Sequence, residues 1–297
     1  ICYCHTPTRY LWSDSLKYVE DLAYPRWLKP AIRAMLTPLR AWDQLAAQRV
    51  DRFIANSQNV AERIAKYYRR EASVVYPPVA INRFHLSTAH ERYFLTGGRL
   101  VPYKRFDIVV QAFNRLGMKL KVFGDGPERK RLQAMAKPQV EFLGRISAEQ
   151  LADCYSRCQA FVQPQVEDFG ITTVEAMASG RPVIAYAAGG AVETVLPGQT
   201  GVLFDEQSWE ALADAVIRFQ PVRFDPELIR QHAMRYDVET FKRGILAIVQ
   251  EEWTKLQERR PTTLRLTDAL REGRAVFTRE RSVPSPLTDD RKPPRLG

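Results

Sequence analysis

Glu167 and Glu175 lie eight residues apart and carry the strongest chemical signal in the chain. A helix is predicted to begin shortly after Glu167, so Glu175 would lie about 12 Å further along at 1.5 Å per residue. Two carboxylates at that separation would contact different parts of one extended ligand. The amides at the start of this helix are unpaired and lie at the positive end of its dipole, where they form an anion site. They belong to Phe169, Gly170, Ile171 and Thr172.

A second group of chemically suggestive residues lies upstream, in the loop from Gly97 to Arg105. Its two glycines, Gly97 and Gly98, let a backbone approach a ligand closely. Arg99 and Lys104 add cationic donors that suit phosphate oxygens. Both groups also have a plainer interpretation, as a solvated basic loop, an exposed loop acid and a glutamate on a helix surface. The residues alone leave both interpretations open.

Weaker signals occur at three other places. The sequence Phe123-Gly-Asp-Gly126-Pro127 fits an ordinary turn from a strand into a helix. Gly144 and Arg145 follow another predicted strand, where they form either a contact to a base or a plain loop. His5 is expected at the end of a strand, either as a contact on the acceptor side or as a structural histidine.

These loops are positioned by a repeating order of strand, loop and helix between Tyr93 and Arg218. The predicted strands are 93–97, 119–123, 140–143, 160–163, 182–186 and 202–204, and helices are predicted at 105–116, 127–136, 148–157, 172–178 and 208–218. Strands that alternate with helices predict a parallel sheet covered by helices, because parallel neighbours need crossover connections. Ligands of such doubly wound sheets bind at the carboxyl ends of the strands, where the loops above lie.

The first third of the chain has a similar but less complete pattern. Helical spacing runs from Trp27 to Arg52, and Pro30 and Pro38 are predicted to break it into pieces. A strand at 52–55, a helix to Tyr68 and a strand at 72–76 follow. The stretch 79–92 has little apolar periodicity and is predicted to connect two domains.

Composition sets further limits. A length of 297 residues corresponds to about two domains of roughly 150 residues each. Hydrophobic residues make up 45% of the chain and charged residues 26%, which excludes wholesale disorder and a fibrous repeat. No apolar run approaches the roughly 20 residues needed to span a bilayer. The four cysteines, Cys2, Cys4, Cys154 and Cys158, are predicted to be core or half-buried thiols of a cytoplasmic protein rather than zinc ligands.

The net charge of +10 is distributed unevenly. Residues 1–93 carry +6, residues 94–254 carry −1 and residues 255–297 carry +5. A protein that binds nucleic acid should concentrate positive charge on its main folded unit, so no nucleic-acid partner is predicted. Basic ends predict instead a contact with an anionic surface, such as lipid headgroups on the inner face of the plasma membrane.

The order and spacing of these residues resemble a known family. Gly98-Arg99, Lys104, Glu167, Glu175, Gly189-Gly190 and Glu193 match the E-x7-E signature region of glycosyltransferase family 4, whose members are retaining enzymes. The resemblance implies the GT-B architecture, an α/β fold of two Rossmann-like, doubly wound parallel-sheet domains, the first of them incomplete here. The sequence Cys4-His-Thr-Pro-Thr-Arg-Tyr-Leu-Trp12 is similar to the branch that builds polysaccharides on lipid-linked acceptors, and many of its members use GDP-mannose.

The resemblance also implies a division of the chain. Residues 1–78 would be the later part of an N-terminally truncated acceptor-binding domain, 79–92 a linker, 93–218 the donor-binding domain, 219–255 closing crossover helices, and 256–297 a basic, largely disordered tail, with a short helix near 264–277. The glycine-rich acceptor loop of the family would lie in the missing part, so the resemblance does not make His5 a catalytic base.

Roles for single residues follow from the resemblance as well. Arg99 and Lys104 would bind the donor diphosphate and neutralise the leaving nucleotide, Glu167 would bind hydroxyls of the donor sugar, and Glu175 would bind the ribose. The amides of Phe169, Gly170 and Ile171 would line the sugar and the diphosphate. No cofactor or metal is expected, which agrees with the absence of an Asp-x-Asp triplet from the chain.

The expected activity is transfer of a hexose, mannose from GDP-mannose, to a lipid-linked or oligosaccharide acceptor in the synthesis of cell-surface polysaccharide. The alternatives are a transferase that uses a UDP-sugar, a nucleotide-sugar epimerase on the same fold, and a fragment that binds the donor without turnover.

Overall fold

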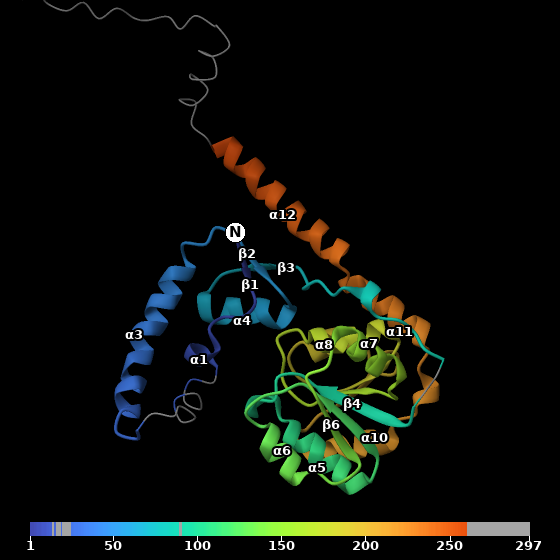
Figure 1. The fold of residues 1–297 in the computed structure, drawn as a ribbon. Helices are drawn as coiled ribbons and strands as arrows, with labels where there is room; N and C mark the ends of the chain where they lie inside the picture. The colour runs from blue at the N-terminus through green and yellow to red at the C-terminus, as the bar shows by residue number, and fades with distance from the viewer. Residues whose placement is uncertain (14, 16–18, 20–24, 89–90, 260–297) are drawn as a thin grey trace, which may run out of the picture. The chain divides into compact units, whose positions relative to one another are not determined.

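The computed structural model describes residues 1–13, 15, 19, 25–88 and 91–259. It divides into two units after Gln250, and the two sheets and the candidate site lie in the first unit, Ile1–Gln250. The strands of the described residues form two parallel sheets within this unit (Figure 1). The predicted tail from 260 onward, with its short helix near 264–277, lies outside the described residues.

The first sheet has three parallel strands in the order β1-β2-β3, namely Cys2–Cys4, Phe53–Ala55 and Ala72–Val74. Helix α1 (Arg9–Trp12) follows β1, α3 (Lys29–Ala47) leads into β2, and α4 (Gln58–Tyr68) connects β2 with β3. Ser57 caps α4, because its Oγ accepts a hydrogen bond from the Val60 amide at 3.1 Å. Val60 and Ile64 on α4 are fully buried against the strands.

The predicted break at Pro38 is wrong, because α3 runs without interruption from Lys29 to Ala47. Pro30 lies in its first turn, where a missing N–H costs little. Pro38 lies inside the helix, where the lost bond and the ring clash cost about 3 kcal/mol. Tertiary bonds after the proline offset this cost, since Arg40 donates to the Leu11 carbonyl at 2.6 Å and Asp43 accepts from Trp12 Nε1 at 2.7 Å.

The second sheet has six parallel strands in the order β6-β5-β4-β7-β8-β9. In chain order they are β4 (Tyr93–Gly97), β5 (Lys119–Phe123), β6 (Val140–Gly144), β7 (Phe161–Gln163), β8 (Val183–Tyr186) and β9 (Gly201–Phe204). The chain moves outward from β4 to β6, returns to the other side of β4 and continues to β9. The strand order therefore reverses between β4 and β7, which makes this the point where an open α/β sheet binds its ligand.

Helices cover both faces of this sheet (Figure 1). One face carries α5 (Phe106–Leu116), α6 (Arg129–Met135) and α10 (Trp209–Arg218), and the other carries α7 (Ala148–Arg157), α8 (Ile171–Ala178) and α11 (Pro226–Ala233). The short helix α9 (Ala191–Thr194) follows β8. Each face has its own apolar core, in which Phe113 and Tyr155 are the largest fully buried side chains. The strands are apolar runs because helices bury both of their faces.

The two chain segments around Val79 and Asp237 lie side by side. The Val79 amide donates to the Tyr236 carbonyl at 2.9 Å, and Val79 forms a parallel bridge with Asp237. Helix α12 then runs from Val238 to Arg259, so it extends into the predicted tail. The division of the chain into domains at 78 and 93 stays a prediction. Among the described residues no helix is both long enough and apolar enough to cross a membrane.

Candidate functional site

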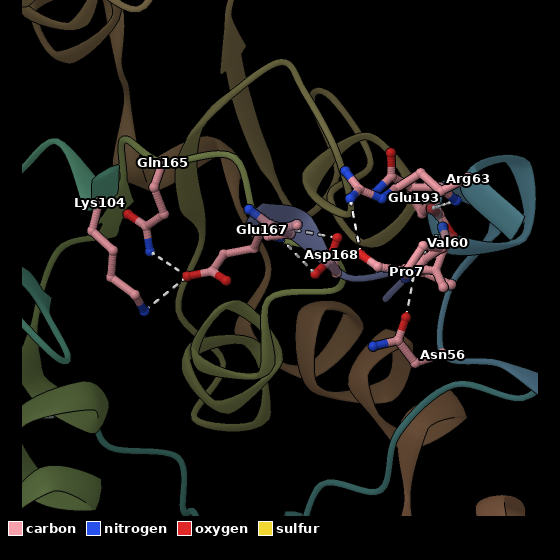
Figure 2. A network of polar contacts seen from close by, with 12 residues as sticks. Pro7, Asn56, Val60, Arg63, Lys104, Gln165, Glu167, Asp168 and Glu193 are labelled. Carbon is pink, nitrogen blue, oxygen red and sulfur yellow. Dashed lines mark hydrogen bonds and ion pairs between the residues drawn. The ribbon is translucent and has the colours of Figure 1, made fainter. Parts of the chain in front are cut away.

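Lys104 and Glu167 meet at the point where the strand order reverses (Figure 2). Lys104 ends a short 3-10 turn after β4, and Glu167 lies in the loop after β7. The distance from Lys104 Nζ to Glu167 Oε1 is 2.8 Å, and both side chains are mostly shielded from solvent. Lys104 Nζ also lies 3.7 Å from where a Cβ on Gly98 would be, so Gly98 is a direct neighbour of the amine. The structure thus joins three of the predicted site residues, Gly98, Lys104 and Glu167.

Gln165 holds the Glu167 carboxylate from a second side. Its Nε2 donates to Glu167 Oε1 at 3.2 Å (Figure 2). Gln165 is 1% exposed. Gln165 Oε1 is buried without a hydrogen-bond partner among the described residues. Since a buried amide oxygen without a partner costs free energy, it is a point where a ligand donor would be accepted.

A turn at Gly189 and Gly190 fixes the backbone of the Glu167 loop. The Gly190 amide donates to the Glu167 carbonyl at 2.8 Å, and Glu167 forms a parallel bridge with Gly189. A Cβ on Gly190 would lie 2.4 Å from the carbonyl oxygen of Phe169. Only glycine permits this approach, so the Gly189-Gly190 turn positions Glu167.

Helix α8 begins at this loop with free amides. Its N-cap is Gly170, whose φ of 91° suits glycine, and no side chain caps the helix. In the described part of the chain, the amides of Gly170, Ile171 and Thr172 donate to no backbone carbonyl. Such a helix start binds anions. The Phe169 side chain is buried against Tyr76 and Tyr236, so Phe169 can offer a ligand only its backbone.

Glu175 lies further along α8 and is half-buried rather than on the helix surface. The Tyr155 hydroxyl donates to Glu175 Oε2 at 3.3 Å. Burial raises the pKa of the Glu175 carboxyl, and the hydrogen bond from Tyr155 lowers it by a smaller amount. Burial also raises the pKa of Tyr155 well above its ordinary value, with the Glu175 carboxylate adding to the effect. Tyr155 therefore remains a hydroxyl that orients Glu175.

Other predicted residues lie at the edge of this arrangement. Arg99 is exposed in the loop after β4 and forms no ion pair with the described residues. Arg145 is 86% exposed and contacts Asp125 at 3.5 Å, while the Arg129 guanidinium lies beside Gly144. His5 is exposed after β1, with its ring edge-on to Tyr3 at 5.3 Å.

Two further side chains, Arg9 and Glu193, connect the two sheets at the site, and neither has a role predicted from the sequence. Arg9 of α1 pairs with Asp168, the residue after Glu167, with 2.9 Å between Nη2 and Oδ1. Glu193 of α9 accepts from the amides of Gln58 and Asn59, each at 2.7 Å, at the start of α4. Arg9 and Glu193 occur in the matched motifs, but residues more than 130 positions apart cannot be paired from spacing alone.

No metal site is apparent in the part of the chain that the structure describes. There, no three His, Cys, Asp or Glu side chains lie close enough to hold an ion together. Cys2, Cys4 and Cys154 are half-buried and Cys158 is buried, all as free thiols.

Residues 80–221 match the family described as Glycosyl transferases group 1. A GDP-mannose-dependent alpha-mannosyltransferase of Mycolicibacterium smegmatis is 32% identical over 189 residues, covering 60% of this chain and 50% of that protein. A GDP-mannose-dependent alpha-(1-6)-phosphatidylinositol monomannoside mannosyltransferase of the same organism is 32% identical over 218 residues, covering 59% and 56%. The chain thus spans about half the length of the curated relatives it matches.

Two solved structures share the fold. Sucrose-phosphate synthase from Thermosynechococcus elongatus has a TM-score of 0.69 at 23% identity, covering 85% of this chain and 67% of that one. HepE from Anabaena, in complex with UDP and glucose, has a TM-score of 0.64 at 25% identity, covering 72% and 67%. These matches confirm the predicted fold class of two Rossmann-like parallel sheets.

Proposed function

We propose that this chain, whose residues 80–221 match the group 1 glycosyl transferases and whose fold is shared with solved glycosyltransferases, transfers a hexose from a nucleoside diphosphate sugar to a lipid-linked or oligosaccharide acceptor. The donor we propose is GDP-mannose, since two relatives at 32% identity are named for this donor. The transfer would retain the anomeric configuration, as in the family that the sequence resembles. The acceptor would belong to a pathway of cell-surface polysaccharide synthesis.

The observation that carries the proposal is the Lys104–Glu167 ion pair beside the start of α8. A diphosphate carries more negative charge than one carboxylate, so on binding it would replace Glu167 as the partner of Lys104. The free amides of α8 and the exposed Arg99 would bind the other phosphate oxygens. Glu167, released from Lys104 but still held by Gln165, would then accept from the sugar hydroxyls.

The second carboxylate would bind the nucleoside. Glu175 is half-buried and already oriented by Tyr155, so little conformational entropy is lost when it accepts from ribose hydroxyls. Hydrogen bonds to a charged acceptor contribute about 1.5–3 kcal/mol each. Glu175 would therefore contribute to donor affinity, and Glu167 to sugar selection.

The chemical step needs charge stabilisation on the departing nucleotide. When the glycosyl–phosphate bond breaks, negative charge accumulates on the diphosphate, and donors that are already in place stabilise it without reorganisation. Lys104, Arg99 and the α8 amides would supply these donors, so the reaction is proposed to need no metal ion.

The first test is nucleotide release by this chain. GDP-mannose, UDP-glucose or another UDP-sugar is incubated with and without an oligosaccharide acceptor, and released GDP or UDP is measured in EDTA. The proposal predicts acceptor-dependent GDP release and an α-linked mannosyl product by NMR. UDP release instead would favour the UDP-sugar alternative, for which the HepE complex with UDP and glucose is a precedent on this fold.

Two variants link that result to the site. Lys104→Ala should lower turnover at least ~100-fold, the scale of one lost transition-state donor, while donor binding falls less. Lys137→Ala, an exposed lysine before β6, is the matched control and should behave like the wild type. Turnover that EDTA abolishes and manganese restores would contradict the metal-independent step. Epimerised donor would identify the epimerase alternative, and binding without any turnover would identify a donor-binding fragment.

A further inference from the structure

Arg105 has a strained backbone directly after Lys104. It lies between the 3-10 turn that ends at Lys104 and the start of α5, and its φ is 53°. Residues other than glycine rarely adopt this left-handed conformation, because the Cβ comes too close to the backbone. Such a conformation persists only where the surrounding structure fixes it. The contacts of Arg105 therefore help to determine where Lys104 lies.

Two side chains hold Arg105. Asp107 accepts from Arg105 Nε at 3.1 Å and from Arg105 Nη2 at 3.3 Å, through its two carboxylate oxygens. Gln207 Oε1 accepts from Arg105 Nη1 at 3.4 Å. Asp107 is a local partner in the first turn of α5, whereas Gln207 follows β9. The bond to Gln207 therefore connects the loop after β4 with the loop after β9.

Gln207 extends this connection to the loop that carries Glu167. Its Nε2 donates to the Pro164 carbonyl at 2.9 Å. Pro164 directly follows β7 and precedes Gln165, whose amide holds the Glu167 carboxylate. The loops that Gln207 joins belong to strands that are not neighbours, since β8 lies between β7 and β9. We call the path from Arg105 through Gln207 to Pro164 the loop bridge.

The loop bridge is independent of the Lys104–Glu167 ion pair. In the proposed function, the donor diphosphate replaces Glu167 as the partner of Lys104, so the two loops lose this direct contact. The loop bridge uses neither the Lys104 amine nor the Glu167 carboxylate. It would therefore remain when the donor is bound, at the stage when the separation of amine and carboxylate decides the rate.

We infer that Gln207 is a positioning residue, which holds Lys104 and Glu167 at a fixed separation while the donor is bound. The inference rests on the proposed function and deepens it. An amide suits this role, because its oxygen accepts from Arg105 while its nitrogen donates to Pro164. A displacement of about 1 Å near the reacting atoms lowers a rate by about 100-fold. Gln207 therefore affects kcat more than donor binding, to which several other groups contribute.

Steady-state kinetics test the inference, with an oligosaccharide acceptor and GDP-mannose or UDP-glucose, whichever supports turnover. Gln207→Met keeps an unbranched side chain and removes both hydrogen bonds. It should lower kcat at least about 10-fold and leave the KM for the donor within about threefold. Gln139→Met is the matched control, because Gln139 Nε2 donates to the Phe113 carbonyl at 3.0 Å, at the opposite end of the same sheet. The control should lose similar stability in thermal unfolding and keep the kcat of the wild type.

Two further variants separate positioning from stability. Gln207→Glu keeps the acceptor for Arg105 but cannot donate to Pro164, so it should lower kcat as well. It also replaces Gln207→Met in the test, should that variant fail to fold. Arg105→Ala should lower kcat, and its effect should not add to that of Gln207→Met, because both changes break the same path.

The outcomes for the inference and for the proposed function differ. A kcat of Gln207→Met equal to that of Gln139→Met would overturn the inference and leave the proposed function standing. Effects of Arg105→Ala and Gln207→Met that add fully would also overturn it, because the two residues would then act separately. Wild-type protein that releases no nucleotide from either donor would refute the proposed function, and the inference with it.

Discussion

The surroundings of Glu175 depend on the tertiary structure, because its carboxylate accepts a hydrogen bond from Tyr155 on another helix. Glu175→Ala should weaken binding of GDP by about 10- to 150-fold, the equivalent of about 1.5–3 kcal/mol for hydrogen bonds to a charged acceptor. Calorimetric titration with GDP measures this directly. Glu167→Ala serves as the comparison, since it should not weaken GDP binding, because GDP no longer has to displace a carboxylate from Lys104, and should weaken the discrimination between GDP-sugars. Equal affinity of the wild type and Glu175→Ala for GDP would refute the ribose role.

The pKa of Glu175 also predicts how stability depends on pH. Burial raises this pKa above 4.5, so the native state holds the proton more tightly than the unfolded chain does. The carboxyl therefore lowers the stability of the protein as pH rises from about 4.5 through the raised pKa. Glu175→Gln removes this effect, so the variant should gain in melting temperature over the wild type between pH 4 and pH 7. A difference in melting temperature that is the same at both pH values would contradict this account of burial.

The residues of the site could be predicted only in part. Lys104 and Glu167 were both candidates from the sequence, but their roles came from the family resemblance, since the residues alone also fitted a solvated basic loop and an exposed loop acid. Their pairing at 2.8 Å could not be predicted from the sequence, because it depends on β4 and β7 being neighbours in the sheet. Gln165 was missed for a related reason: its amide gains a role only when its neighbour Glu167 is held in place.

At the scale of elements, the turn after β8 is where a small change should have the largest effect. Gly190→Ala would place a Cβ 2.4 Å from the Phe169 carbonyl oxygen, and the backbone shift should cost about 1–3 kcal/mol. Donor affinity should fall as well, because Gly190 holds the Glu167 carbonyl. Denaturant unfolding and donor titration measure the two effects.

Gly198→Ala is the matched control for that turn. Gly198 has a φ of 77° with open space around it, so alanine there should cost about 1 kcal/mol of backbone strain and leave donor affinity unchanged. If both variants lost donor affinity equally, the Gly189-Gly190 turn would have no special link to Glu167.

Most elements could be predicted from local pattern. The alternation of apolar strands and amphipathic helices from Tyr93 to Arg218 gave the parallel sheet, because each crossover needs a helix. The predicted break at Pro38 was wrong because hydrogen bonds from Arg40 and Asp43 to distant residues stabilise α3. The spacing of apolar residues gives no information about such bonds. The strand order, with its reversal between β4 and β7, likewise comes from the tertiary structure.

At the scale of the first unit, Glu193 joins the two sheets. Its carboxylate accepts from the Gln58 and Asn59 amides at 2.7 Å each, and it follows the turn that positions Glu167. Burial raises the pKa of Tyr76, and the negative charge of the nearby Glu193 carboxylate raises it further. Glu193 thus connects the start of α4 with the loop that carries the site.

Glu193→Gln keeps the shape of the side chain and removes the negative charge that accepts hydrogen bonds from the amides at the start of α4. We expect a loss of about 1.5 kcal/mol in unfolding free energy and a several-fold lower kcat, with the donor Kd within about twofold. Glu210→Gln, an exposed acid in the first turn of α10, should change none of these. A kcat equal to that of the wild type would show that the contact serves stability alone.

The proposed site binds a nucleoside diphosphate sugar where the strand order reverses, with Lys104 on its phosphates. Calorimetric titration of GDP-mannose into the wild type, Lys104→Ala and Lys137→Ala in EDTA tests it most directly. The account predicts saturable binding by the wild type and Lys137→Ala, and affinity at least about 10-fold weaker for Lys104→Ala, since a charge-assisted bond contributes about 1.5–3 kcal/mol. Equal affinity of Lys104→Ala and the wild type for GDP-mannose would contradict it.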